Sequence, residues 1–190
     1  MSGAVAIQGS IITLGVVSGP GVAAVFGGTR TIARAPLQLA GLITRPSLPE
    51  LTRAQTAGDY KTVRRINLVN ILVAVLATFP FAGILGLFGP ELLYWVSRGQ
   101  LSAPTSLFWL LAGATAANAV WMAAATPLIA ENRQGSFSHI YLLLCGGVAL
   151  TPLYSSDEAL INLAAALFTA EAVCGVVVAL ALRRNASRAA

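Results

Sequence analysis

The feature that most limits the fold of this chain is a series of apolar segments long enough to cross a lipid bilayer. The clearest of them lie at 66–88, 106–129 and 159–182, and a shorter one lies at 137–153. A helix needs about 20 mostly apolar residues to cross the hydrocarbon core of a membrane. We therefore expect an all-α integral membrane bundle, with residues 1–190 forming a single domain.

The charge content favours a membrane protein over a water-soluble one. Only 10% of the 190 residues are charged and 56% are hydrophobic, and the mean hydropathy is +0.76. Soluble domains usually carry about 25% charged residues. Cys145 and Cys174 both lie in apolar segments, so we expect buried packing residues and neither a disulfide nor a metal site. The glycine pairs of GGTR and CGGV are expected to be close-packing positions between helices.

The amino-terminal part of the chain allows two arrangements. A single helix over 3–29 would leave only Ala35 to Thr44 for the next crossing, about 15 Å of helix against a core of about 30 Å. A turn at SGPG, residues 18–21, removes this difficulty, because adjacent glycine and proline are strong turn signals. We therefore expect spans at 3–18 and 22–44, which brings the number of crossings to six.

The second of these spans carries two arginines near its midpoint. Arg30 and Arg34 flank Ala33, and each costs about 2.5–3.5 kcal/mol on the insertion scale. Gln38 follows at the same spacing and is expected on the same face, while Pro36 is expected to bend the helix. Charges at this depth nearly always face a protein interior or a wet cavity. Two interpretations stay open, a structural pair with carbonyls or a carboxylate, and an anion site in a transport cavity.

Other polar side chains lie at membrane depth. Asn118 is near the middle of its segment, with Thr115 one helical turn away. A buried asparagine more often makes a helix–helix hydrogen bond than a ligand contact. Glu171 is the only acid at this depth in the predicted spans. It is expected to be protonated, paired with Arg30 or Arg34, or part of a proton-coupling step, and the sequence does not rank these roles.

Basic residues are concentrated in alternate loops. If the amino-terminus is inside, the outer loops carry one basic residue, Arg98, and the inner ones carry nine. The nine are Arg45, Arg53, Lys61, Arg64, Arg65, Arg133, Arg183, Arg184 and Arg188. The positive-inside rule then predicts that both termini are cytoplasmic. The net charge of +5 therefore has a topological role, and no nucleic-acid partner is expected.

The inner loop RPSLPELTRAQTAGDYKTVRR separates the second and third spans. Its segment 50–57 is expected to lie on the membrane surface as a short amphipathic turn, and Asp59 is expected to cap the next helix. Elsewhere the chain lacks HExxH, GxSxG and phosphate-cradling glycine motifs. We therefore expect no enzyme activity, no catalytic residue, no metal and no cofactor.

A helix with a central arginine, followed by P-S-L-P-E-L and by A-G-D with a basic entry to the next helix, resembles the carboxy-terminal half of polysaccharide flippases. These proteins export O-antigen and other lipid-linked oligosaccharides, and they belong to the superfamily that includes the multidrug and toxin extruders. The resemblance extends from about Ile7 to Arg184. It implies one lobe of a two-lobed transporter, which moves a polyprenyl-pyrophosphate-linked oligosaccharide across a bacterial inner membrane by alternating access.

The resemblance also implies that Arg30 faces the central cavity. Together with Arg34, Gln38 and Asn118 it forms the expected substrate-binding set, because guanidinium groups bind phosphate oxygens in pairs. Glu171 is the expected coupling or ion-pair residue. The implied partners are the lipid-linked glycan, membrane lipids, and an amino-terminal lobe or a second copy of the chain. The alternatives are a membrane subunit with a structural or assembly role and a fragment of a multidrug-type exporter.

Overall fold

The computed structural model describes residues 2–133, 135–154 and 158–189, and the side chains of residues 8–42, 44–133, 135, 137–154 and 158–183. Within these residues the regular elements are all helical. They are α1 (Ser2–Ser18), α2 (Pro20–Ala33), α3 (Ala35–Thr44), α4 (Ser47–Thr56), α5 (Tyr60–Val96), α6 (Thr105–Ala130), α7 (Gly135–Leu150), the 3-10 helix η1 (Thr151–Tyr154) and α8 (Ala159–Ala189).

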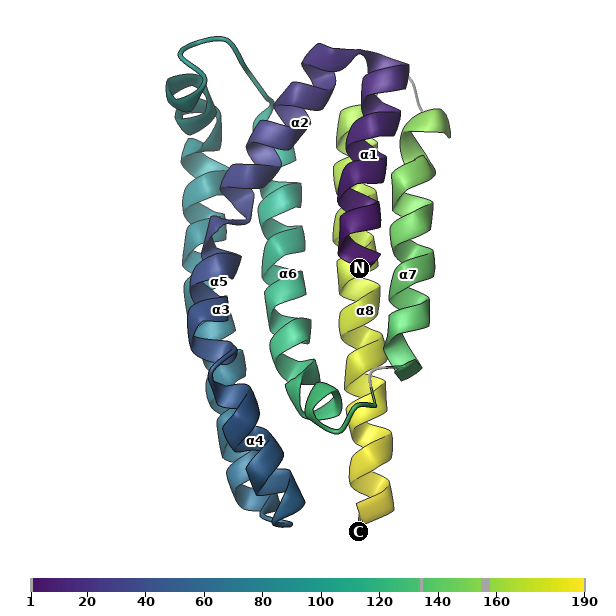
Figure 1. Cartoon of the computed structure of the whole chain (residues 1–190). Coiled ribbons are helices and arrows are strands. Elements are labelled where there is room, and N and C mark those ends of the chain that lie inside the picture. The colour runs from purple at the N-terminus through teal and green to yellow at the C-terminus, as the bar shows by residue number, and fades with distance from the viewer. Residues whose placement is uncertain (1, 134, 155–157, 190) are drawn as a thin grey trace.

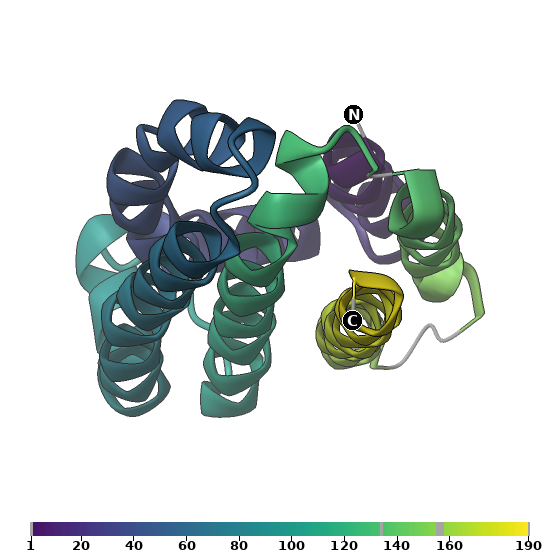
Figure 2. The ribbon, with the colours of Figure 1, turned by 90° about the horizontal axis from the view of Figure 1, so that it is seen from below.

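The helices form one bundle, in which α1, α5 and α7 run in one direction and α2 to α4, α6 and α8 run in the other (Figure 1). Helices α3 to α6 lie on one side, and α1, α7 and α8 lie on the other (Figures 1 and 2). Helix α2 passes obliquely across α6, while α6 packs against both α5 and α8. The core joins the two sides through fully buried side chains such as Leu14, Phe26, Leu107 and Leu163.

Four helical segments of the described chain are long and apolar enough to cross a membrane. They are Tyr60–Val96, Thr105–Ala130, Phe137–Tyr154 and Ala159–Arg183. These segments contain the four clearest predicted spans, so the prediction of an all-α, membrane-embedded protein is confirmed. Where its side chains are described, α1 contributes a shorter apolar stretch, Gln8–Ser18, which is not one of these four segments. The turn predicted at SGPG is also present, with Gly19 between α1 and α2 at φ 91°.

The second predicted span, 22–44, is not one continuous helix but is interrupted at Arg34, where α2 ends and α3 begins. Pro36 has no N–H and therefore cannot bond to the carbonyl of Ile32. The N–H of Leu37 instead donates to the carbonyl of Arg34 at 3.1 Å, three residues back. The interruption thus falls beside the proline that was expected to bend the helix, and it changes which residues of α3 continue the face of α2.

Helix α4 is docked onto the bundle. Its Leu51 and Ala54 are buried, and the helix packs against both α5 and α6. The side-chain amide of Gln55 donates to the carbonyl of Pro127 in α6 at 3.0 Å. The segment expected to lie on the membrane surface therefore has its apolar face covered by protein.

Asp59 caps the amino-terminus of α5, as predicted. Its carboxylate accepts hydrogen bonds from the hydroxyl of Thr62 at 2.6 Å and from the N–H of Thr62 at 3.1 Å. These contacts hold the pKa of Asp59 below its usual range. The preceding Gly58 has φ 71°, a backbone conformation that favours glycine, and so allows the sharp entry into the helix.

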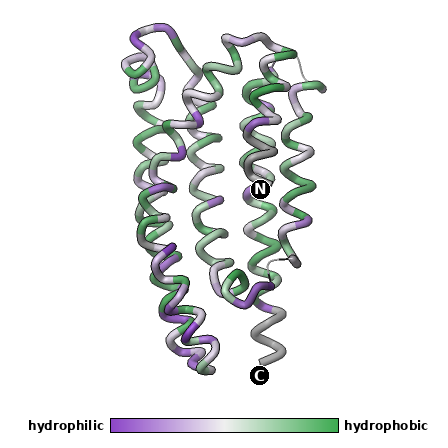
Figure 3. The backbone as a smooth tube through the Cα atoms, viewed as in Figure 1, coloured by the Kyte–Doolittle hydropathy of each residue, from purple (hydrophilic) through white to green (hydrophobic). Residues whose placement is uncertain are grey.

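The hydrophilic segments gather at the ends of the bundle (Figure 3). Helix α4, the first turns of α5, the connection between α6 and α7, and the end of α8 lie at the same end, whereas the connection between α5 and α6 lies at the other (Figure 1). The basic residues of the predicted inner loops belong to the first group, except Arg45, which lies between α3 and α4, and Arg98 belongs to the second. Arg184 and Arg188 have side chains outside the described part.

The predictions for the cysteines and the glycine pairs are confirmed only in part. Cys145 and Cys174 are buried, as predicted, and their thiols are free. The predicted glycine contacts are wrong for three of the four positions, because a Cβ at Gly27, Gly146 or Gly147 would meet no atom within 4 Å.

The close approach is instead between α5 and α6. A Cβ on Gly86 would lie 2.2 Å from the ring of Trp109, and one on Gly89 would lie 2.3 Å from the ring of Phe108. Small residues at such positions let two helices in a membrane come close together. These glycines therefore allow the packing of α5 against α6.

Candidate functional site

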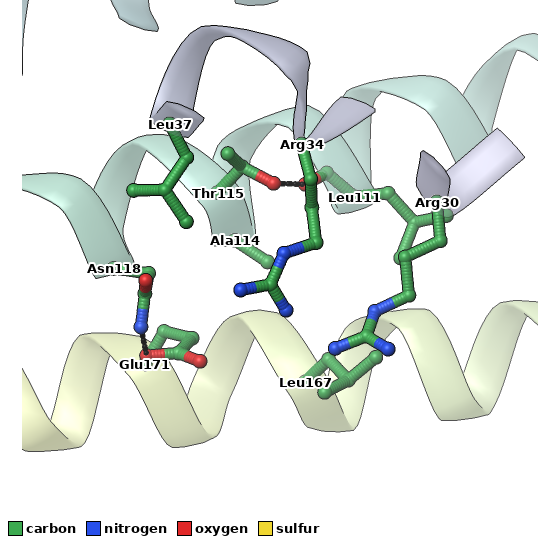
Figure 4. Close-up of a pocket in the computed structure, with 9 residues that line it drawn as sticks. All are labelled: Arg30, Arg34, Leu37, Leu111, Ala114, Thr115, Asn118, Leu167 and Glu171. Atoms are coloured by element: carbon green, nitrogen blue, oxygen red, sulfur yellow. Dashed lines mark hydrogen bonds between the residues drawn. The ribbon is translucent and has the colours of Figure 1, made fainter. Parts of the chain in front are cut away.

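Two arginines point into a small cavity between the helices (Figure 4). It is lined by Arg30, Arg34, Leu37, Leu111, Ala114, Thr115, Asn118, Leu167 and Glu171, from the α2–α3 segment, α6 and α8. Its volume is about 30 Å³. A cavity needs about 10–15 Å³ to hold one water molecule. The space beside the guanidinium groups is therefore enough for only one or a few small groups.

Neither arginine has a protein counter-ion in contact. Among the described residues, the only ion pair is the exposed one between Arg133 and Glu131, at 3.5 Å. Arg30 and Arg34 are half-buried and lie beside the apolar side chains of the same cavity. A buried charge without a partner is costly, and a second positive charge nearby adds repulsion. The site is therefore electrostatically suited to receive an anion.

Glu171 lies at the edge of this cavity, but its carboxylate is occupied by neutral donors. The side chain is 9% exposed. One carboxylate oxygen accepts from Nε1 of Trp121 at 2.7 Å and from Nδ2 of Asn118 at 2.9 Å. The hydroxyl of Tyr141 lies 3.1 Å from the other oxygen. The ion pair with Arg30 or Arg34, one of the three roles left open for Glu171, is not formed among the described residues, because the carboxylate is held at the junction of α6, α7 and α8.

The other predicted site residues differ in whether their side chains line the cavity. Asn118 makes a helix–helix hydrogen bond to Glu171 of α8, one of the two roles considered for it, and its side chain also lines the cavity. The hydroxyl of Thr115 donates to the carbonyl of Leu111 at 2.9 Å (Figure 4). Gln38 is exposed and does not line this cavity, where Leu37 is found instead. The predicted row of Arg30, Arg34 and Gln38 is therefore wrong at its last member, because the interruption at Arg34 ends the helical spacing.

A second, larger cavity continues from the first. Its volume is about 330 Å³, and it shares Arg34, Leu37 and Asn118 with the smaller cavity. It follows α3 as far as Arg45, which the sequence assigns to a loop with a purely topological role. Gln38 does not line this cavity either. Arg34 thus lies where the two cavities meet.

Trp121 and Tyr141 complete the Glu171 cluster but were not among the predicted site residues. Their rings pack edge to face, with centroids 5.1 Å apart at an interplanar angle of 63°. Tryptophan in membrane proteins is enriched at the two interfaces. Trp121 instead lies well inside its span, three residues after Asn118. This unusual depth is the sequence signal from which a polar partner for its N–H could have been inferred.

The arrangement provides two cations for an anion and a carboxylate held by three donors. Among the described residues, no group of three or more histidine, cysteine, aspartate or glutamate side chains is placed to hold a metal ion. No protein-family model, curated protein or solved structure matches the chain.

Proposed function

We propose that this bundle is one lobe of a transporter that moves a polyprenyl-pyrophosphate-linked oligosaccharide across the bacterial inner membrane. The observation that carries the proposal is the pair Arg30 and Arg34, directed into a cavity inside an apolar bundle without a carboxylate in contact. A pyrophosphate is a dense negative charge that has to pass the apolar interior. Two guanidinium groups offset that cost, because each can bind phosphate oxygens through two N–H groups.

In this proposal six helical segments cross the membrane, and α1 and the α2–α3 segment are the first two. A second lobe or a second copy of the chain faces the arginines and completes the path. Rocking of the two lobes around the anion site then exposes the site to each side in turn. The bundle supplies no hydrolytic chemistry in this scheme, and its task is to bind, shield and release the anion.

The first test is binding by the purified full chain in lipid nanodiscs, with a polyprenyl pyrophosphate as the probe. Arg30→Ala and Arg34→Ala are each expected to weaken binding at least about tenfold, since a hydrogen bond to a charged group contributes about 1.5–3 kcal/mol. Arg→Lys at either position should retain part of the affinity, because it keeps the charge but loses the planar fork. The matched control is Arg53→Ala, an exposed arginine of α4 that lines neither cavity.

Each variant is also assayed for thermal stability and for transfer of a fluorescent lipid-linked oligosaccharide across proteoliposomes, with and without a coexpressed second lobe. Normal affinity in the folded double variant Arg30→Ala/Arg34→Ala would remove the basis of the proposal. Loss of folded protein in every single variant would favour the structural interpretation of the arginines.

The proposed orientation predicts opposite labelling of the two ends of the bundle. In a variant without the buried Cys145 and Cys174, a cysteine at exposed Thr56 should react only with a reagent that enters the cytoplasm. A cysteine at exposed Gln100 should react with an impermeant reagent added from outside. Labelling of position 56 from outside in intact cells would contradict cytoplasmic termini.

A further inference from the structure

The larger cavity exists because small residues face each other across α3 and α6. Ala40 and Gly41 of α3 and Ala119 and Ala123 of α6 line it. Side chains of this size leave the space between the helices unfilled. The resulting volume of about 330 Å³ falls in the range of small-ligand pockets, about 300–1,000 Å³.

The charges of this cavity are all positive. Arg34 lies before the first residue of α3 and Arg45 after the last, and no aspartate or glutamate is among the lining residues. The intervening helix has 10 residues, which corresponds to about 15 Å of axial length. Apolar walls with a cation at each end are suited to an amphiphilic anion, whose charged group contacts an arginine while its apolar part lies along the wall.

The side chain of Arg45 folds back toward the cavity. Its Nε lies 3.7 Å from the position that a Cβ would take on Gly41. Helix α3 runs toward the end of the bundle that holds α4 and the first turns of α5 (Figure 1), so Arg45, which follows α3, is nearer that end than Arg34, which precedes it. A ligand arriving from that end therefore meets Arg45 before it reaches Arg34 and Arg30.

We propose that a phosphate or diphosphate group binds first at Arg45 and then moves along α3 to Arg34 and Arg30. Arg45 is called the loading contact below, because it is the first of the two binding positions on this path. This inference rests on the function proposed above and specifies how the ligand enters. The shared ligand chemistry is the phosphate group, which a lipid diphosphate or free inorganic pyrophosphate could supply. The apolar walls favour the lipid diphosphate.

The test is association kinetics, measured by stopped flow with the full chain in nanodiscs and a fluorescent polyprenyl pyrophosphate. Arg45→Gln is expected to slow association about fivefold or more and to reduce its dependence on salt, because charges at the entrance of a site act mainly on the association rate. Arg45→Lys should restore most of the rate, since steering depends on charge. Arg53→Gln controls for general attraction by the basic surface and should leave the rate within about twofold of wild type.

A second variant blocks the path without changing any charge. A Cβ at Gly41 would meet only the Arg45 side chain, at 3.7 Å, so Gly41→Leu should fold normally while its side chain occupies the cavity. We expect slower association from this variant as well. A separate titration with inorganic pyrophosphate should show much weaker binding than the lipid diphosphate.

If Arg45→Gln and Gly41→Leu leave the association rate unchanged while Arg34→Gln abolishes binding, Arg45 is not the loading contact. The proposed function would then remain intact. Normal binding in Arg34→Gln would overturn both. Equal slowing by Arg45→Gln and Arg53→Gln would also overturn the loading contact, because attraction would then come from the whole basic surface. Equal affinity for inorganic pyrophosphate would overturn the lipid as the ligand source.

Discussion

Gly89→Ala is expected to destabilise the bundle strongly, by forcing α5 away from α6. The added Cβ would stand 2.3 Å from the ring of Phe108, which is 0% exposed and therefore has no space into which to move. Forcing an extra carbon into a well-packed core typically costs about 1–3 kcal/mol and occasionally more. Thermal unfolding in detergent, together with the yield of folded protein, measures this loss.

Two other glycines of α5 provide controls for the same substitution. At Gly83 a Cβ would meet nothing within 4 Å, so Gly83→Ala should be neutral or slightly stabilising. At Gly86 the Cβ would stand 2.2 Å from the ring of Trp109, but that side chain is 48% exposed and can swing outward. Stability should therefore decrease in the order Gly83→Ala, Gly86→Ala, Gly89→Ala, and equal stability of the first and the last would refute the tight α5–α6 contact.

The general fold could be predicted because segment length and apolar content decide whether a helix crosses a bilayer. The four segments that the structure shows as candidate membrane spans could be recognised from their own residues, without knowledge of their neighbours. The helix cap at Asp59 and the turn before Pro20 could also be predicted, because each depends only on residues that are close together in the sequence. The interruption at Arg34 could be predicted only in part. Pro36 indicates that the helix is disturbed there, but a bend and a restart of the helix are both compatible with a proline.

Contacts between helices could not be predicted, since they depend on how each helix is rotated about its axis. GGTR and CGGV have the composition of a packing motif, yet the close approach is at Gly86 and Gly89. For the same reason the sequence left an ion pair as one of three open roles for Glu171, whereas the side chain is turned toward Trp121 and Tyr141. Arg30 and Arg34 thus have no carboxylate in contact among the described residues, and the proposed function is based on this observation.

The three donors around Glu171 lead to the second large expected effect. Glu171→Ala should lower the stability of the bundle, because the buried N–H of Trp121 and the amide of Asn118 lose their acceptor. Side-chain hydrogen bonds within membrane bundles average about 0.6 kcal/mol and reach about 1.7. Loss of three of them should therefore cost about 2 kcal/mol or more. Glu171→Gln should be milder, because its amide oxygen still accepts a hydrogen bond.

Thermal unfolding of the purified chain measures this effect, with Glu158→Ala as the matched control. Glu158 is exposed just before α8, so its replacement should leave the unfolding temperature almost unchanged. The double variant Glu171→Ala/Arg34→Ala separates the two roles of the carboxylate. If Glu171 acts through its neutral donors, removal of Arg34 should not restore stability. If the two side chains form an ion pair, the double variant should recover part of the loss, because no unpaired charge remains. Such recovery would make Arg34 a structural partner of Glu171 and would weaken its assignment as an anion contact.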